Sequence, residues 1–142
     1  MVREKSFGEY TFTTDSEKVD YAVVIGYLKR SYWASDIPPE TSIRAIKNSL
    51  CFSILFNDEM VGFSRVVTDF ARFAYLADVF ILEEHRGKGL SKLLMEFILA
   101  YPGIKGCRFL LATRDAHGLY VKYGFKVLDD SWKFMIRKEE KK

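Results

Sequence analysis

Glycines and basic residues gather between an apolar segment and an amphipathic one in the middle of the chain. Residues 73–82 are apolar except for Asp78, and Arg86-Gly87-Lys88-Gly89-Leu90-Ser91 follows shortly after them. Apolar residues then recur at helical spacing up to Tyr101. This order predicts a buried strand, a tight glycine turn and an amphipathic helix. Glycines let the backbone approach an anion, which the first free N–H groups of the helix then face, so we expect a phosphate-bearing ligand.

Two other glycine patterns that bind phosphate do not fit these residues. A Walker loop needs widely spaced glycines followed by Lys and Ser or Thr, and Gly87-Lys88-Gly89 is too compact for it. A dinucleotide fingerprint needs a third glycine where Lys92 stands. It also needs an acidic residue about 20 positions further on, where the chain has Cys107-Arg108-Phe109 and apolar neighbours. A nucleotide triphosphatase and a dinucleotide enzyme are therefore disfavoured.

The same residues resemble the signature of the GNAT acetyltransferases, in which Arg or Gln, two variable residues, Gly, one variable residue and Gly or Ala join a central strand to a helix. Residues 86–91 fit it except at Ser91, which stands in place of Gly or Ala. A second stretch, residues 116–125, is similar to the family's Ala-x-x-Leu-Tyr-x-Lys-x-Gly-Phe helix. Thr113 occupies the position where the family often has Asn. The resemblance covers residues 60–125 well and the remainder by length and pattern.

This resemblance implies an α/β (α+β) fold: a mixed, mostly antiparallel central sheet with a splayed parallel strand pair and helices on both faces. It also implies acetyl-CoA as the cofactor, with the pantetheine arm against the backbone of Val79, Phe80 and Ile81 and a contact from Thr113. The pyrophosphate is expected on the turn and the start of the helix, where Lys88, Lys92 and Arg86 add positive charge. The residues expected in that part of the site are Arg86, Gly87, Lys88, Gly89, Leu90, Ser91 and Lys92.

Two residues are candidates for the proton transfers of acetyl transfer. Asp78 places a carboxylate in an otherwise apolar strand, which is costly without partners or a wet cleft. It is either the general base or a structural residue paired with Arg65 or Arg114, while Asp69, Glu9 or a water chain are weaker alternatives. Tyr120 matches the tyrosine that the family commonly uses as general acid for the leaving thiolate. Its alternative is a core tyrosine with a satisfied hydroxyl.

The acceptor site is expected beneath the first two helices and their connector, as the resemblance implies. Its candidate residues are Tyr32, Trp33, Phe63, Arg65 and Tyr75. Trp33 forms either an aromatic wall of the pocket or a cap over the core. An aromatic and partly anionic pocket favours an amine, but nothing in the sequence selects a small molecule over a peptide.

We therefore expect an N-acetyltransferase that moves the acetyl group from acetyl-CoA to a primary amine by direct attack in a ternary complex. Ser91 and Thr113 leave one alternative open, a non-catalytic acyl-CoA-binding domain with a regulatory role. A weaker alternative is a structural or regulatory partner in which the glycine turn binds nothing.

The composition of the 142-residue chain sets wider limits. It predicts one domain, residues 1–142, with a frayed tail at about 138–142. Lysines and arginines exceed acidic residues by 22 to 19, too small an excess for a nucleic-acid partner. No signal region or long apolar run is present, so we expect no membrane partner and a cytoplasmic location. Cys51 and Cys107 are predicted to be buried thiols, no metal is expected, and a monomer and a homodimer both remain possible.

The remaining pattern places the other elements. We expect an edge strand at residues 10–13, helices at 17–32, 40–49 and 116–123, and strands at 51–56, 60–67 and 107–112. Asp115 is the expected cap of the last helix, and Gly124 its end. Residues 125–128 and 132–136 are predicted to close the sheet as a pair of strands.

Overall fold

The protein was studied as a computed structural model that describes residues 1–139. The chain divides into two compact units, Met1–Ala112 and the segment that begins at Thr113. Each unit is described by itself below, and the expected single domain stays a prediction. The expected frayed tail lies largely outside the described residues.

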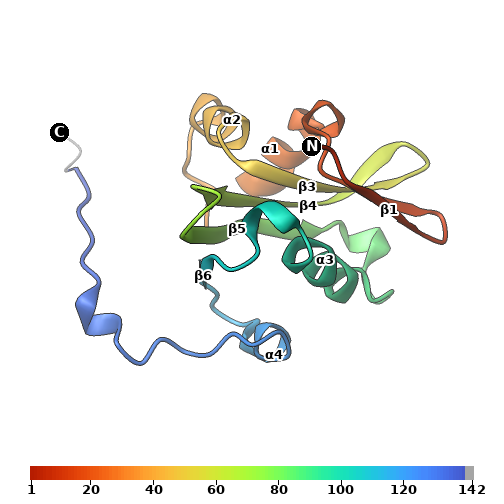
Figure 1. The fold of residues 1–142 in the computed structure, drawn as a ribbon. Helices are drawn as coiled ribbons and strands as arrows, with labels where there is room; N and C mark the ends of the chain where they lie inside the picture. The colour runs from red at the N-terminus through yellow and green to blue at the C-terminus, as the bar shows by residue number, and fades with distance from the viewer. Residues whose placement is uncertain (140–142) are drawn as a thin grey trace. The chain divides into compact units, whose positions relative to one another are not determined.

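The first unit is built on a sheet whose strands follow one another in sequence order (Figure 1). Neighbouring strands are antiparallel except for the last two, which run parallel. Over the described residues the six strands are β1 (Glu4–Phe7), β2 (Tyr10–Thr13), β3 (Leu50–Phe56), β4 (Glu59–Thr68), β5 (Phe73–Ile81) and β6 (Arg108–Leu111).

A strand that the sequence pattern does not reveal lies outside β2. β1 pairs with β2 from Glu4 opposite Thr13 to Phe7 opposite Tyr10. The predicted strand at residues 10–13 is therefore confirmed as β2, but its predicted position at the edge of the sheet is wrong. β1 is short, largely exposed and partly charged, and it therefore lacks the apolar alternation that predicts a strand. These same properties suit a sheet edge, because charged side chains discourage pairing with other chains.

The predicted helix over residues 17–32 is divided in two. A 3-10 turn, Ser16–Lys18, comes first, and α1 (Tyr21–Lys29) follows. Asp20 begins α1, since its carboxylate accepts the N–H of Val23 at 3.2 Å. A carboxylate at this position satisfies an N–H group that has no partner inside the helix, so α1 starts later and is shorter than predicted.

α1 and α2 (Pro39–Lys47) lie on one face of the sheet (Figure 1). Pro39 at the start of α2 has the fixed φ angle that suits the first turn of a helix. The two helices and their connector bury apolar side chains against β3, β4 and β5. The buried members of this core are Val19, Val24, Leu28, Ala34, Ile46, Cys51, Leu55, Met60, Phe63 and Phe80.

α3 (Leu90–Leu99) packs on the opposite face (Figure 1). Its Phe97 makes edge-on ring contacts with Phe12 of β2 and Phe52 of β3, each at a centroid distance of 5.9 Å. Helices on both faces of a mostly antiparallel sheet with one parallel pair confirm the predicted fold class. No helix in residues 1–139 is both long and apolar enough to cross a membrane.

The second unit contains the short helix α4 (His117–Val121), inside the predicted range 116–123. No side chain caps the first turn of α4, so the predicted cap by Asp115 is wrong; the Thr113 hydroxyl accepts the N–H of Ala116, just before the helix, at 3.0 Å. The helix ends at Val121, earlier than predicted, and Gly124, with φ of +89°, ends the turn that follows.

The prediction of strands at 125–128 and 132–136 is wrong for the described chain. The first segment has no regular structure, and Ser131–Lys133 forms a 3-10 turn that includes Trp132. A strand requires a partner strand for its backbone hydrogen bonds, and neither segment has one among the described residues. The apolar residues that suggested the two strands are present, but a partner strand for them is not found among residues 1–139.

Candidate acetyl-transfer site

The glycine turn lies between the end of β5 and the start of α3, where the sequence places it. Gly87 and Gly89 have φ angles of +79° and +77°, in the left-handed region that favours glycine. A Cβ atom added at either position would meet no atom within 4 Å, so the space above the turn is open. Gly89 is the N-cap of α3, and no side chain caps this end. The first N–H groups of α3 therefore face an open space in which an anion fits.

β5 and β6 part before β5 ends. They pair only from Phe73 opposite Arg108 to Leu76 opposite Leu111, whereas β5 continues to Ile81. On its other side, β5 stays paired with β4 as far as Ile81. The backbone of residues 77–81 thus has no strand on the β6 side within the described chain. Its N–H and C=O groups on that side have no strand partner there, and the Ile81 carbonyl accepts from the Arg86 side chain.

A β-bulge lies where the two parallel strands separate. The register between β4 and β5 shifts between Phe63, which is opposite Phe80, and Arg65, which is opposite Ala77. Asp78 lies in this irregularity with a φ angle of +53°. This backbone conformation is uncommon outside glycine, although Asp and Asn adopt it more readily than most residues. From this position the Asp78 side chain reaches Trp33, in the connector between α1 and α2.

Both carboxylate oxygens of Asp78 accept hydrogen bonds. Arg65 Nε lies 2.6 Å from Oδ2, and Trp33 Nε1 donates to Oδ1 at 2.8 Å. The Arg65 and Asp78 side chains are only 18% and 11% exposed. Arg65 Nη1 also donates to Ser49 Oγ at 3.2 Å. Of the two partners that the sequence offered to Asp78, the structure brings Arg65 to it.

Cys51 lies opposite Arg65 in the β3–β4 register and is buried beside this ion pair. Burial raises the pKa of its thiol to about 11, with a smaller opposing effect from the Arg65 charge. The predicted buried thiol is confirmed for Cys51, whereas Cys107 is only partly buried.

The side chain of Arg86 turns back from the glycine turn toward the end of β5. Its Nε donates to the carbonyl of Ile81 at 2.9 Å, and its Nη2 donates to the Tyr27 hydroxyl at 2.7 Å. The Tyr27 ring stacks on Phe80 with centroids 4.2 Å apart. Arg86 and Tyr27 thereby fix α1 against the end of β5. The sequence singled out Arg86 for its charge but not this contact with Tyr27.

The residues expected around the acceptor differ in exposure. Tyr32 and Trp33 are 51% and 38% exposed, and their rings meet edge to face at 5.2 Å. Tyr75 is half-buried in β5. Phe63 is completely buried in the core. It therefore packs inside the sheet and does not line a surface.

A contact that the sequence did not suggest holds the turn from the other side. The Tyr10 hydroxyl and His85 Nδ1 are 2.8 Å apart, and their rings meet at right angles. His85 directly precedes Arg86, so β2 supports the segment that leads into the glycine turn. An aromatic residue in β2 and a histidine next to the turn were visible in the sequence, but only the fold brings them together.

In the second unit, Tyr120 is buried, and its ring lies edge-on to Phe125 at 5.9 Å. The Thr113 hydroxyl accepts the N–H of Ala116, as described above. The roles expected of these two side chains toward a cofactor stay predictions.

A family profile described as "Acetyltransferase (GNAT) domain" matches residues 47–127. That range contains the turn, the parting strands and Tyr120, and it covers more than half of the chain. The chain belongs to the GNAT acetyltransferase family. The recognition made from the two motifs is therefore confirmed, and the protein is an acetyltransferase.

Relatives of this GNAT protein agree with the assignment. A crystal structure from Xanthomonas campestris pv. campestris, of a protein proposed to be a GNAT-family acetyltransferase, is 44% identical. Its TM-score is 0.88, and the match covers 92% of this chain and 93% of that one. A proposed acetyltransferase from Gibberella zeae is 28% identical, and the match covers 81% of this chain and 77% of that protein. A Clostridium acetobutylicum structure, 14% identical with a TM-score of 0.65, shares the fold over 97% of this chain and 96% of its own.

Proposed function

We propose that this GNAT protein transfers the acetyl group of acetyl-CoA to a primary amine by direct attack in a ternary complex. The observation that carries the proposal is the combination of an open β5 edge at residues 77–81 with a glycine turn at the end of the same strand. The first offers backbone groups to an extended amide-bearing chain, and the second offers N–H groups to an anion. A molecule that fits both has an amide-containing arm joined to a phosphate group, as CoA has.

The cofactor assignment follows from that geometry. The pyrophosphate is placed on the N–H groups of residues 87–92, with Lys88 and Lys92 supplying positive charge. The pantetheine arm is placed along Val79, Phe80 and Ile81. The Clostridium acetobutylicum neighbour is described as solved with acetyl-CoA, which supports the proposal for the shared fold.

The last residue of β5 already makes a hydrogen bond to a side chain, and this limits which backbone groups can bind the pantetheine arm. Arg86 Nε already donates to the Ile81 carbonyl. Of Val79, Phe80 and Ile81, Ile81 is therefore the residue whose carbonyl is least available to the pantetheine arm. We therefore assign the principal backbone contacts to Val79 and Phe80. Arg86 is assigned to hold the strand end in position, with its charge close to the turn.

The chemistry requires a leaving group and two proton transfers. The amine nitrogen attacks the thioester carbonyl carbon, the new C–N bond forms and the C–S bond breaks. Tyr120 donates its phenolic proton to the leaving thiolate, and the proton of the amine passes to water. Asp78 is assigned a positioning role in place of the base role, because both of its oxygens already accept hydrogen bonds from Arg65 and Trp33.

The acceptor is a small molecule or peptide that presents its amine beside Trp33 and Tyr32. Exposed aromatic rings attract the ammonium form of an amine through cation–π contact. The Asp78 carboxylate accepts from Trp33 Nε1 and so fixes the orientation of that ring. The amine loses its proton before attack, since only the neutral form is nucleophilic.

Calorimetric titration with acetyl-CoA tests the cofactor site. The Gly89→Glu variant places bulk and negative charge where the pyrophosphate is assigned, and we expect it to abolish binding. Gly8→Glu is the matched control, because Gly8 also has positive φ and open space around its Cβ position but lies in the β1–β2 turn. Equal loss of binding in both variants, or equal retention, would remove the turn from the site.

A further inference from the structure

The part of β5 assigned to the pantetheine arm has less strand pairing than the rest of that strand. Residues 77–81 lie beside β4 on one side but have no strand partner on the β6 side among the described residues. A strand with one neighbour makes only part of its possible backbone hydrogen bonds, so its shape depends more on what its side chains contact. Asp78 and Phe80 make such contacts on the face of the sheet that α1 covers.

Two aromatic side chains, one from α1 and one from the connector after it, contact these two residues. The Tyr27 ring stacks on the Phe80 ring, with an interplanar angle of 8° and centroids 4.2 Å apart. Trp33 Nε1 donates to Asp78 Oδ1 at 2.8 Å. The Tyr27 and Trp33 rings are themselves 6.2 Å apart, within the range of aromatic contact. The two contacts with β5 therefore belong to one aromatic cluster.

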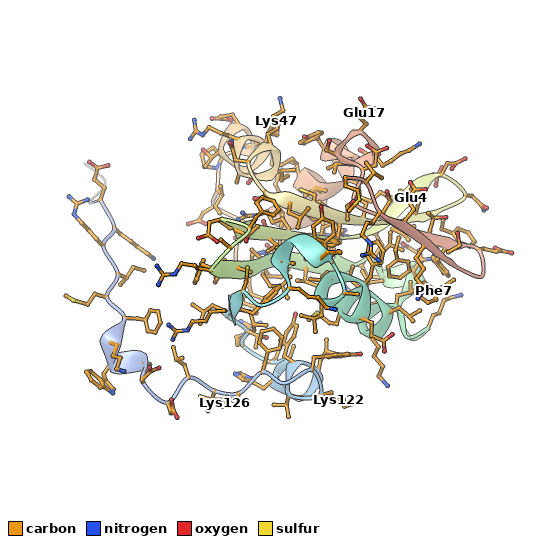
Figure 2. All side chains as sticks on the ribbon, viewed as in Figure 1. Glu4, Phe7, Glu17, Lys47, Lys122 and Lys126 are labelled. Atoms are coloured by element: carbon orange, nitrogen blue, oxygen red, sulfur yellow. The ribbon has the colours of Figure 1, made fainter. Side chains whose placement is uncertain are left out.

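The Tyr27 hydroxyl also reaches the glycine turn. Figure 2 shows the charged side chains of Glu17 and Lys47, in the same helical layer, projecting away from the sheet. The Tyr27 hydroxyl instead accepts from Arg86 Nη2 at 2.7 Å, and Arg86 Nε donates to the Ile81 carbonyl at 2.9 Å. Arg86 begins the signature turn, and Ile81 is the last residue of β5. One side chain of α1 thus holds both the strand and the start of the turn.

A second contact from α1 reaches the segment between β5 and the turn. The Arg30 guanidinium lies 4.8 Å from the centroid of the Tyr27 ring, and its Nη2 is 3.3 Å from Glu83 Oε2. Glu83 belongs to the 3-10 turn that joins β5 to Arg86. Both side chains of this ion pair are more than half exposed, and such pairs contribute little. The main effect therefore belongs to Tyr27.

We propose that Tyr27 is a positioning residue for acetyl transfer. It holds Phe80 through its ring and Arg86 through its hydroxyl, and so keeps the end of β5 and the start of the turn in the arrangement that binds acetyl-CoA. Because this arrangement exists before the ligand arrives, less conformational freedom is lost on binding. Tyr27 acts through these residues and has no assigned contact with the cofactor. The role rests on the proposed function, since it requires acetyl-CoA to bind along β5 and at the turn.

Calorimetric titration with acetyl-CoA tests this role without an acceptor. Tyr27→Phe keeps the ring but removes the oxygen that accepts from Arg86, and we expect the Kd of acetyl-CoA to rise about 5-fold. Tyr27→Leu also removes the stacking on Phe80 and should raise the Kd about 20-fold.

Tyr21→Leu is the matched control, because Tyr21 also lies in α1 and packs against the same core. It should leave the Kd unchanged, even where urea unfolding shows that it destabilises the protein as much as Tyr27→Leu does. An equal rise in Kd in the two leucine variants would show that lost stability is the cause, and would overturn the positioning role.

A double-variant cycle tests whether the hydroxyl acts through Arg86. In the Arg86→Met protein, Tyr27→Phe should cause no further loss of affinity. The full 5-fold loss in that background would overturn the proposed route through Arg86. Wild-type binding with an unchanged Kd in Tyr27→Leu would overturn the positioning role alone. Failure of the wild type to bind acetyl-CoA would contradict the proposed function, and this role with it.

Discussion

Arg65 and Asp78 form an ion pair across β4 and β5, at the place where the parallel strands separate. The Arg65 Nε to Asp78 Oδ2 distance is 2.6 Å, and both side chains are largely buried. Asp78 reaches this position because the bulge gives it a left-handed backbone conformation. The pair therefore links the irregular backbone of β5 to the regular strand beside it, directly next to the proposed pantetheine site.

Replacement of Arg65 by Met should destabilise the protein strongly. It leaves the Asp78 carboxylate buried without its cation, and removing one partner of a buried ion pair costs about 3–5 kcal/mol. The free energy of unfolding in urea measures this loss. Arg44→Met, at an exposed position of α2, is the control and should cost less than about 0.5 kcal/mol. Equal losses in the two variants would show that the pair does not stabilise the fold.

The variant Asp78→Asn separates positioning from base catalysis. Asn tolerates the left-handed conformation and still accepts from Trp33, but it cannot bear a charge toward Arg65. We expect kcat/KM to fall by less than about 100-fold, with the shape of its pH profile unchanged. If the variant lost an ionisation that the acidic side of the wild-type profile shows, Asp78 would be the general base.

Replacement of Tyr120 by Phe removes the proposed acid while keeping the ring. The rate constant kcat should fall by about 100-fold or more, because the thiolate must leave without a proton from the protein. Affinity for acetyl-CoA, measured by calorimetry, should be unchanged. Tyr123→Phe, in the turn after α4, is the matched control and should retain turnover. Full activity of the Tyr120 variant would exclude it as the acid.

The two cysteines should differ in reactivity. Burial raises the pKa of Cys51 to about 11, so its thiol stays protonated and inaccessible at pH 8. Cys107 is partly exposed. With Ellman's reagent, the native Cys107→Ser protein should show no reactive thiol until it is unfolded, and Cys51→Ser should react as folded protein. Rapid labelling of native Cys107→Ser would contradict the burial of Cys51.

Asp69 provides a pH-dependent contact in the turn between β4 and β5. Its Oδ1 accepts the N–H groups of Ala71, Arg72 and Phe73 at 2.8–3.0 Å. These hydrogen bonds, that from Phe73 first, lower the pKa of its carboxyl from 3.8 to about 2. The carboxylate thus stabilises the turn above pH 4 and loses this effect as the pH falls through 2.

An NMR titration of the Phe73 amide checks this assignment. Its shift should follow a midpoint at about 2 in the wild type and should not titrate in Asp69→Asn, which keeps an acceptor oxygen without an ionisable group. A wild-type midpoint near 3.8 would show that the turn does not hold the carboxylate. A carboxylate that accepts three backbone hydrogen bonds is also a poor general base. This disfavours Asp69 as the alternative base that the sequence left open.

Local patterns in the sequence predicted the parts of the fold that depend on neighbouring residues. The glycine turn could be predicted because left-handed backbone conformations and helix starts favour particular residue types. The strand β5 could be predicted because it is apolar on both faces. β1 was missed because an exposed, charged edge strand has no apolar pattern. Strands at residues 125–128 and 132–136 were predicted from short apolar segments, but such segments do not show whether a partner strand is present.

Contacts between distant segments were not predictable in the same way. The sequence left Arg65 and Arg114 as equal partners for Asp78, since the choice depends on a register shift between β4 and β5. The contacts of Trp33 with Asp78 and of Tyr27 with Arg86 depend on how α1 and its connector lie over the sheet. Phe63 was expected near the acceptor because the family resemblance places that site under the first two helices, and the structure buries its side chain completely in the core.

The central claim is that acetyl-CoA gives its acetyl group directly to an amine on this protein. The most direct measurement is mass spectrometry of the products after incubation with acetyl-CoA and a panel of small-molecule and peptide amines. We predict one acetyl group on the nitrogen of an acceptor, with an equal amount of free CoA thiol, and neither product with Gly89→Glu. Absence of any acetylated amine while acetyl-CoA binds at the turn would contradict the account.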